Sequence, residues 1–336
     1  MNPKAVQHIS ECLIKPQRIL QETRHPWYLT PWDLLMLSVH YIQKGLLFAK
    51  PTPYQEFNIM DLLEKLKHSI ALTLVHFYPL SGRLATSKTE DPASYVVYVD
   101  CSNSPGARFV YATLDMTVSD ILSPTYVPLV VQSFFDHDKA LNHDGHVRSL
   151  VTIQVTELVD GVFIGCSMNH AMGDGASFWH FLNTLSEIFQ AQGGDVQISR
   201  PPVLERWFPD GCGELLEHNL GWAAWIVHEA VVNQGDQEIR ERLDSWIKSP
   251  SLYHIGQMFD PYSVMMGSSP RFNKYGCEFG MGKALTLRSG YAHKFSGKVS
   301  AYPGREGGGS VDLEVCLPPD SMIALESDEE FMDAMA

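Results

Sequence analysis

The sequence lacks the long apolar runs that a membrane protein needs. No stretch approaches the roughly 18–20 consecutive apolar residues of a membrane-spanning helix. The N-terminus also lacks the uninterrupted apolar core of a signal peptide, because Glu11, Lys15 and Arg18 interrupt it. We therefore expect a cytosolic protein that has no membrane as a partner.

Closely spaced cysteines are also missing. The six cysteines are far apart, and no two have the Cys-x-x-Cys spacing of zinc or redox sites. Cys166 and Cys316 lie in apolar, strand-like runs and are expected to be small buried hydrophobic side chains. The pattern predicts free thiols in a reducing compartment and argues against a disulfide framework.

Positive charge is scarce. The chain has 25 Lys and Arg against 39 Asp and Glu, and its formal net charge of −14 argues against nucleic acid as a partner, since phosphate contacts need a basic surface. Residues 271–305 are the exception, with seven basic residues and one acidic residue, Glu278. Such a patch suits a small polyanion such as a nucleotide-bearing cofactor. Strand-edge lysines that guard against aggregation explain the composition equally well.

What the chain does contain is typical of a globular protein, with 45% hydrophobic and 19% charged residues. Its 336 residues fit two domains better than one. The proline-bearing residues 200–210 predict a linker, and two helical stretches follow at about 214–232 and 237–248. Strands are predicted for three C-terminal segments: residues 283–288, 297–302 and 310–317.

The N-terminal portion has the pattern of two helices with a hairpin between them. Residues 61–77 and about 175–190 repeat apolar side chains at the spacing of an amphipathic helix, and Asp174 is well placed as the N-cap of the second helix. Residues 151–155 alternate apolar and polar side chains, which predicts a half-buried strand. An Asp-Gly dipeptide then favours a hairpin turn into a second strand.

Residues 169–175, Asn-His-Ala-Met-Gly-Asp-Gly, are the main candidate for catalysis. His170 leaves the end of the second strand before a glycine-broken turn, which places an imidazole on a rigid edge beside open space. A general base needs a fixed position and a pKa near the working pH, and a histidine supplies both. Spacing alone also fits an ordinary surface or core histidine, because the chain has 14 of them.

Other motifs favour non-functional interpretations. The carboxylate and histidine clusters at 136–138 and 143–146 lack a helix to present metal ligands on one face, so a solvated loop is favoured over a metal site. Residues 280–282 lack the third small residue of the dinucleotide pattern, and residues 304–309 lack the ending of a phosphate loop. Ser167 lacks the flanking glycines of a nucleophile elbow, which argues against a hydrolase.

Four motifs, in one order, resemble the BAHD acyltransferases, a mostly plant family that uses acyl-coenzyme A. The pattern His-x-x-x-Asp-Gly at 170–175 follows an apolar strand, as it does in that family. Residues 30–34 (Thr-Pro-Trp-Asp-Leu) are similar to the family's N-terminal strand entry, and residues 77–83 to its Tyr-Pro-Leu-Ala-Gly-Arg segment. Residues 278–282 (Glu-Phe-Gly-Met-Gly) are similar to its Asp-Phe-Gly-Trp-Gly motif. Together the matches span most of the chain.

The resemblance implies an α/β fold of mixed sheets with flanking helices, arranged as two chloramphenicol-acetyltransferase-like domains with a channel between them. It implies that His170 takes the proton from the hydroxyl or amine of a small-molecule acceptor, which then attacks the thioester of acyl-coenzyme A. Asp174 and Gly175 would shape the loop that carries this base. Acyl-CoA would be a co-substrate, so we expect no metal and no bound cofactor, and we expect a monomer.

The C-terminal motif is implied to be remote from the bond chemistry. A structural role is expected for four of its residues: Glu278, Phe279, Gly280 and Gly282. Here a glutamate and a methionine replace the family's aspartate and tryptophan, a change that needs local repacking only. Arg288 and Lys294, in the basic segment, are candidates for contacts to the phosphates of coenzyme A.

The chain also departs from the family. His170 and Glu278 are only 108 positions apart, and the family's Asn-x-Arg-x-Arg and Tyr-x-Gly-Asn segments, which lie between the two motifs, are absent. An arginine of the first segment pairs with the acid of the C-terminal motif, so Glu278 is expected to lack that partner. We predict an internally deleted protein with three parts: a first domain over residues 1–195, a linker with the deletion junction over 196–213, and a truncated second domain over 214–336.

Two alternatives stay open. One is a condensation domain like those of peptide synthetases, which also uses His-x-x-x-Asp-Gly but carries a second histidine where this chain has Asn169. The other is a catalytically impaired or inactive relative that binds a ligand or partner, and the missing segment favours it.

Overall fold

The structure is a computed structural model of the whole chain, and its described residues are 5–21, 25–51, 57–90, 93–102, 104–191, 198–205, 245–246, 248–249 and 263–335. Several sequence predictions fall outside these residues. They are most of the linker with the deletion junction over 196–213, the helix over 214–232 and most of the helix over 237–248.

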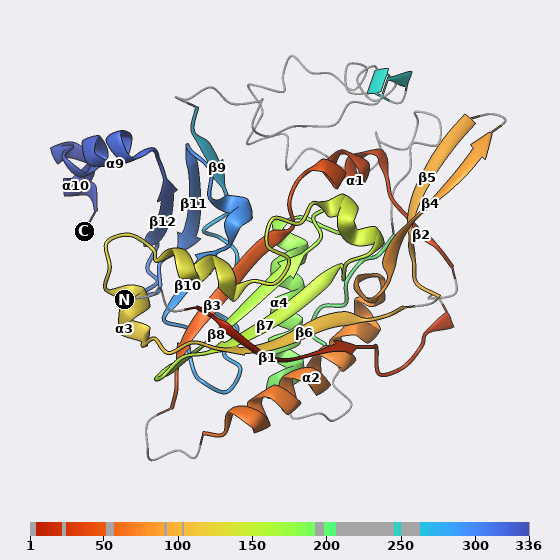
Figure 1. Cartoon of the computed structure of the whole chain (residues 1–336), viewed down its shortest axis with the longest axis horizontal. Coiled ribbons are helices and arrows are strands. Elements are labelled where there is room, and N and C mark those ends of the chain that lie inside the picture. The colour runs from red at the N-terminus through yellow and green to blue at the C-terminus, as the bar shows by residue number, and fades with distance from the viewer. Residues whose placement is uncertain are drawn as a thin grey trace.

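A six-stranded mixed sheet forms the centre of the molecule (Figure 1). Its strand order is β1-β6-β7-β8-β3-β10. The strands are β1 Gln7–Ile14, β6 Ala107–Thr113, β7 Val151–Glu157, β8 Gly161–Met168, β3 Ile42–Ala49 and β10 Thr286–Ser289. β6 and β7 run parallel and the other neighbouring pairs run antiparallel. The mixed α/β class predicted from the sequence is therefore confirmed.

Two long helices, α2 and α4, cover one face of this sheet (Figure 1). α2 (Ile59–His76) begins at the N-cap Asn58, and α4 (Gly175–Gln190) begins at the N-cap Asp174. Both helices match the amphipathic patterns, and the predicted N-cap of α4 is confirmed. Their apolar stripes join the sheet in one large core, which fixes the start of α4 relative to the end of β8.

The hairpin of β7 and β8 is buried on both faces, so the prediction of a half-buried strand is wrong. All residues of the two strands except the last of β7 are buried. The second face of the sheet carries its own small core around Phe134 and Phe163, which includes residues of α3 (Val118–Leu122) and η4 (Leu129–Phe134). The polar residues of the alternating pattern therefore face a covering loop and not solvent.

Two three-stranded sheets flank the centre. The first consists of β2 (Trp27–Tyr28), β5 (Ala93–Asp100) and β4 (Arg83–Glu90). The second consists of β12 (Val311–Cys316), β11 (Lys298–Pro303) and β9 (Met265–Gly267). In Figure 1 the second sheet, in blue, lies beside β3 and β10, with the C-terminal helices α9 (Pro319–Glu326) and α10 (Glu329–Ala334) beyond it. The remaining short helices are α1 Pro31–Leu35, η2 Met36–Ser38, η3 Tyr78–Ser81, η5 Asn142–His146 and η7 Tyr291–His293.

The three strands predicted near the C-terminus are confirmed, but the first of them does not join the other two. It forms β10, which pairs antiparallel with β3 at the edge of the central sheet, from Thr286 opposite Leu47 to Ser289 opposite Lys44. The C-terminal part of the chain is thus tied to the N-terminal part by backbone hydrogen bonds.

The five cysteines in the described part of the chain are free. Cys166 is buried, as predicted, whereas Cys316 is only half-buried. Cys212 lies outside the described residues. A search of those same residues finds no helix with the length and apolar character needed to cross a lipid bilayer.

Candidate active site

His170 lies just past the end of β8, at the edge of the central sheet. Asn169 continues the sheet by one residue, because its N–H donates to Leu150 O at 2.8 Å. The next N–H, that of His170, donates instead to a side chain, Asn142 Oδ1, at 2.7 Å. The imidazole is thus half-buried and is carried by backbone that is fixed on both sides.

Asp174 fixes the loop that follows the histidine. Its carboxylate accepts hydrogen bonds from Ser177 N and Ser177 Oγ, both at 2.9 Å, which caps the first turn of α4. A Cβ at Gly173 would lie 2.6 Å from Ser177 Cβ, so the turn between the histidine and the cap needs glycine. Asp174 is exposed, and its hydrogen bonds are those of a helix cap and not of a partner bonded to the imidazole.

The imidazole of His170 is electrically neutral near neutral pH. Burial lowers its pKa from the ordinary value and outweighs the backbone groups of His170 and Gly173 and the carboxylate of Asp174, which act in the opposite direction. Nδ1 is buried and forms no hydrogen bond of good geometry within the described residues. A neutral imidazole is the form that accepts a proton, so this pKa shift keeps His170 ready to act as a base.

A second histidine, His293 in η7, interacts electrostatically with His170. Burial holds the pKa of His293 well below its ordinary value, and the nearby Lys44, Lys298 and His170 lower it further. Its Nε2 is buried without a hydrogen-bond partner among the residues described. Protonation of either ring therefore disfavours protonation of the other. No pattern in the sequence pairs these two histidines, because they are 123 positions apart.

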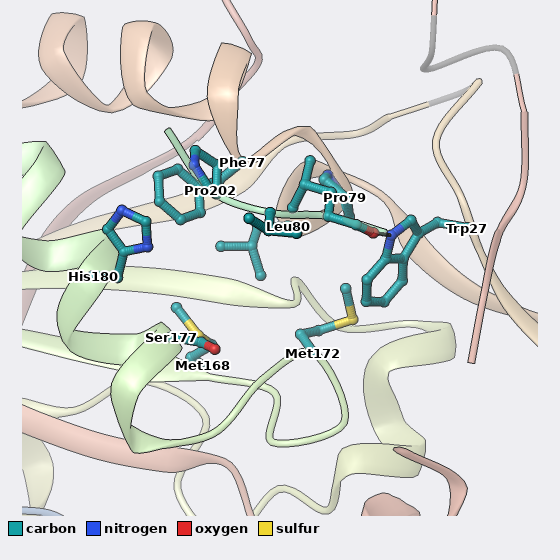
Figure 2. A pocket seen from close by; sticks show the side chains of 11 residues that line it. Trp27, Phe77, Pro79, Leu80, Met168, Met172, Ser177, His180 and Pro202 are labelled. Atoms are coloured by element: carbon teal, nitrogen blue, oxygen red, sulfur yellow. Dashed lines mark hydrogen bonds between the residues drawn. The ribbon is translucent and has the colours of Figure 1, made fainter. Parts of the chain in front are cut away.

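A cavity of about 560 Å³, which includes its open mouth, lies beside the histidine loop (Figure 2). Met168 and Met172, two residues before and two residues after His170, form part of its wall, although His170 itself does not line it. The remaining lining residues are Trp27, Phe77, Pro79, Leu80, Ser177, His180, Pro202, Val203 and Leu204. The wall is thus mostly apolar and aromatic, which is typical of a small-molecule pocket.

Hydrogen bonds hold residues 198–205 across this cavity. Trp27 Nε1 donates to Leu204 O at 2.9 Å, and His180 Nε2 lies 2.8 Å from Arg200 O. The ring of His180 also packs edge-on against Phe77, with 5.3 Å between the ring centroids. In Figure 2 the rings of Trp27, Phe77 and His180 face the two methionines across the open space. The cavity therefore has a defined shape made by segments far apart in sequence.

The motif at residues 278–282 makes a sharp turn ahead of β10. Phe279, Gly280 and Gly282 all have positive φ, at 47°, 76° and 74°. The buried ring of Phe279 packs edge-on against Phe48 of β3 and Phe189 of α4, at centroid distances of 6.1 and 5.6 Å. The turn therefore wedges an aromatic ring between the central sheet and the helix.

The acid that opens this motif is exposed. Within the described residues the Glu278 side chain takes part in no ion pair, and its backbone N–H donates to Ser186 Oγ at 3.2 Å. The backbone, and not the carboxylate, connects this end of the motif to α4. That Glu278 lacks an arginine partner stays a prediction.

Two lysines of the basic segment, Lys274 and Lys298, are buried, whereas its other basic residues are half-buried or exposed. We define the lysine cluster as Lys44, Lys274, Lys294 and Lys298 together with Glu314. Lys44 Nζ donates to Tyr302 Oη at 2.8 Å, and Tyr302 Oη donates to Glu314 Oε2 at 2.9 Å. Lys294 forms an ion pair with Glu314, and Lys274 Nζ donates to Ala301 O at 3.1 Å. One acid thus serves several cations.

The two residues predicted to contact coenzyme A phosphates already have partners inside the protein. Lys294 is paired with Glu314, and Arg288 donates to Thr286 Oγ1 and to Leu287 O. Their role toward coenzyme A stays a prediction.

The histidine and carboxylate clusters around position 140 differ from the solvated loop that we expected. His137 is only 7% exposed and its Nε2 lies 3.2 Å from Ser149 O, while Asn142 is fully buried. Of the residues that the structure describes, no three His, Cys, Asp or Glu side chains are grouped closely enough to hold a metal ion. The loop is therefore partly buried: His137 and Asn142 face inward, whereas Asp138 and His143 are exposed. No periodic pattern in the sequence indicated the inward-facing asparagine.

A family model described as the Transferase family matches this chain over residues 4–209 and 204–332. The two matches meet at residues 204–209, within the predicted linker. They also place the histidine motif in the first match and the motif at 278–282 in the second.

Two plant relatives align with nearly the whole chain. An uncharacterized acetyltransferase of Arabidopsis thaliana is 26% identical over 446 residues, which covers 98% of this chain and 99% of the relative. The BAHD acyltransferase DCR of the same organism is 24% identical and covers 97% of this chain and 92% of its own length. Because this chain has 336 residues, the first alignment contains at least 110 positions for which it has no residue.

Solved structures with the same fold support the assignment of the architecture. Vinorine synthase matches with a TM-score of 0.64 and 17% identity over 98% of both chains. TRI101 of F. sporotrichioides, complexed with coenzyme A and T-2, matches with a TM-score of 0.60 and 13% identity over 92% of this chain and 98% of its own. At these identities the likeness concerns the fold alone.

Proposed function

From the premise that this chain belongs to the Transferase family, the BAHD acyltransferases, we propose that His170 is its general base. Acyl transfer from acyl-CoA to an alcohol or amine is the activity of this family, and the chain is accordingly an acyltransferase of the non-aminoacyl kind. The proposal adds a residue and a proton path to that family-level activity.

The observation that carries the proposal is the position and state of one ring. His170 stands at the end of a rigid strand, half-buried, with a lowered pKa and with a capped helix directly behind its loop. In the proposed reaction the neutral imidazole takes the proton of the acceptor hydroxyl or amine as its oxygen or nitrogen attacks the thioester carbonyl. The C–S bond then breaks, and the leaving coenzyme A thiolate takes the proton that the imidazole had accepted, which returns His170 to its neutral form.

The apolar cavity beside Met168 and Met172 is the proposed location for the acceptor. Its aromatic and thioether wall suits a small molecule with an apolar body, and its polar atoms at Ser177 and His180 are few. Asp174 and Gly175 are proposed to act through the loop geometry, and the residues of the 278–282 motif through packing. We keep the proposals of a monomer in the cytosol that needs no metal and no bound cofactor.

We also propose that the second domain is incomplete, with the junction in residues 196–213. The two family-model matches that meet at 204–209 support this, as do the positions of the 446-residue alignment that this chain does not fill. The three-part division of the chain rests on the same support. An incomplete second domain removes part of the channel wall, so an impaired relative that binds without turnover is the second candidate. The fact that His170 does not line the described cavity favours it.

The test is turnover by the full chain. Purified protein is incubated with a panel of acyl-CoA thioesters and small alcohols and amines, and the free thiol of released coenzyme A is measured. We expect acceptor-dependent release that His170→Ala lowers by about 10²–10⁴-fold, while His143→Ala, an exposed histidine of the neighbouring loop, leaves it within about twofold. Turnover that survives His170→Ala excludes the general-base role. Acyl-CoA binding without any turnover establishes the second candidate.

A further inference from the structure

We infer that Asn142 is a positioning residue for His170: a side chain from a distant loop that fixes the backbone on which the imidazole is carried. The inference rests on the proposed role of His170 and goes beyond it, because Asn142 bonds to the backbone N–H of His170 and does not line the cavity. It starts from an unusual feature of the strand end. The N–H of His170 bonds to the Oδ1 of an asparagine side chain 28 positions earlier in the chain.

Asn142 uses every hydrogen-bonding group it has. Its side chain accepts from His170 N at 2.7 Å and donates to Met36 O at 2.7 Å. Its backbone N–H donates to Val39 O at 2.8 Å, and its backbone oxygen accepts from Asn169 Nδ2 at 2.7 Å. The residue is fully buried, with 0% of its surface exposed. It therefore joins the end of β8 to the segment that follows α1.

The orientation of this amide is fixed by its neighbours. Oδ1 faces a donor, the N–H of His170, whereas Nδ2 faces an acceptor, the carbonyl of Met36. A flipped amide would place oxygen against oxygen and nitrogen against N–H, and would leave both buried groups without a partner. Only one arrangement satisfies the site, so the position of the His170 backbone is defined to within the tolerance of a hydrogen bond.

Asn169 completes the support from the strand side. Its Nδ2 donates to Asn142 O, and its Oδ1 accepts from Ala171 N at 3.1 Å, so it spans the histidine along the chain. Asn169 is also 0% exposed. A Cβ at Gly145 would lie 2.7 Å from Asn169 Nδ2, so this glycine lets η5 approach closely enough for the contact. We call Asn142 and Asn169 the asparagine pair.

The pair explains how a histidine beyond the last rung of a sheet is held in place. A base that moves by about 1 Å loses on the order of 10²-fold in rate. The backbone hydrogen bonds of the sheet end at Leu150 O. Beyond that point the asparagine pair holds the backbone through neutral hydrogen bonds that do not change with pH. Loss of Asn142 should therefore act on the ring of His170 and on turnover, and not on substrate affinity.

The experiment compares three variants of the full chain. Asn142→Leu has a similar shape and removes all three side-chain hydrogen bonds, those to His170 N, Met36 O and His40 O. Asn142→Asp keeps an acceptor for the His170 N–H but loses the donor to Met36 O. His143→Ala, an exposed neighbour in η5, is the matched control. For each protein we would measure kcat and KM in the coenzyme A release assay, the pH profile of kcat, and the ring resonances of His170 through an NMR titration.

We expect Asn142→Leu to lower kcat by about 10²-fold with KM within about twofold, and to shift both the His170 resonances and the apparent pKa of the kcat profile. Asn142→Asp should recover part of this loss at acidic pH, where a protonated carboxyl again donates to Met36 O. His143→Ala should resemble the unaltered protein. The NMR titration does not need turnover, and Asn142→Asp serves if Asn142→Leu fails to fold.

Two results overturn the inference: unchanged His170 resonances in a folded Asn142→Leu protein, or a loss of activity expressed entirely in KM. The two proposals fail separately. If His170→Ala keeps full turnover, the general-base role is excluded while the NMR titration still reports on the support. If His170→Ala abolishes turnover and Asn142→Leu leaves kcat unchanged, the base role stands and the positioning role is excluded.

Discussion

The molecule buries polar side chains in two regions, and it does so in opposite ways. The asparagine pair behind His170 is neutral, and its hydrogen bonds of 2.7 to 3.1 Å satisfy both amides. The lysine cluster between β3 and the C-terminal sheet is charged, with four lysines around the single acid Glu314. Lys274 is 0% exposed and Lys44 is 4% exposed, so solvent does little to screen them.

The difference in charge predicts a difference in how the two regions respond to pH. A neutral amide with all its hydrogen bonds formed holds one geometry at every pH, which suits the support of a base. Burial of a cation that has no counter-charge of its own either lowers the pKa of that group or destabilises the fold. Burial lowers the pKa of Lys44 and of Lys274 to about 7, against the ordinary value of 10.5. We therefore expect the C-terminal attachment, and not the histidine support, to depend on charge and pH.

The largest predicted effect comes from removing the acid of the lysine cluster. Burial raises the pKa of Glu314, but Lys294 and Lys44 outweigh it, so the carboxylate is charged and compensates both lysines. Glu314→Gln should destabilise the protein by about 3–5 kcal/mol, as expected when one partner of a buried ion pair is lost. Urea unfolding measures this. Glu306→Gln, an exposed acid near the same sheet, should change the free energy of unfolding by less than about 0.5 kcal/mol.

A loss below about 1 kcal/mol for Glu314→Gln would place the cluster in the same class as a surface ion pair. The comparison between the two regions would then fail, because the lysines would not depend on the buried carboxylate of Glu314.

The second predicted effect is a rise of stability between about pH 7 and 8.5. The unfolded lysines keep their protons up to about pH 10.5, whereas folded Lys44 and Lys274 release theirs near pH 7. The unfolded state therefore binds more protons in this window, so the free energy of unfolding increases with pH, by up to about 1.4 kcal/mol per pH unit for each lysine. The penalty is fully present below pH 7. Urea unfolding at both pH values measures the slope.

This pH window lies between the range in which the buried histidines titrate and the range in which the thiols titrate. Histidines with lowered pKa, such as His170 and His293, increase the free energy of unfolding with pH only up to about pH 6.5. Burial raises the pKa of Cys101 and Cys277 to about 12, so as the pH approaches the ordinary thiol value of 9.0 their unfolded thiols ionise first and stability falls, which limits the window at its upper end. Lys44→Met should remove about half of the slope. An unchanged slope in that variant would show that Lys44 does not carry the buried charge.

Local features of the fold were predictable from the sequence because neighbouring residues specify them. The amphipathic spacing of α2 and α4 and the capping carboxylate of Asp174 need no information from elsewhere in the chain. The hairpin turn between β7 and β8 is equally local. The loop that carries His170 follows from these elements, so the position of the candidate base at a strand end could be predicted.

Features that depend on distant segments could not be predicted. The polar alternation of β7 indicated solvent on one face, but a loop ending in Phe134 covers that face. Asn142 and His293 approach His170 from segments 28 positions before and 123 positions after it. The composition of residues 271–305 suggested a basic surface, yet Lys274 and Lys298 are buried and Lys294 pairs with Glu314 of the adjacent β12.

The smallest predicted effect tests whether charge matters at the histidine support. Asp174 accepts two hydrogen bonds at the start of α4, and its charge raises the pKa of His170 against the larger effect of burial. Asp174→Asn keeps the cap, so it should cost only a few tenths of a kcal/mol, whereas Asp174→Ala should cost about 1 kcal/mol. The NMR titration of His170 should show a small lowering of its pKa in both variants, because both remove the same charge.

The two variants separate geometry from charge. If kcat depends on the hydrogen bonds of the helix cap, the kcat of Asp174→Asn stays near that of the unaltered protein and the kcat of Asp174→Ala falls. The support then works through geometry and not through charge, as the asparagine pair suggests. If both variants lose activity equally although only one loses the cap, the carboxylate acts on the imidazole through its charge. The histidine region would then depend on charge as the lysine cluster does, and the contrast between the two regions would disappear.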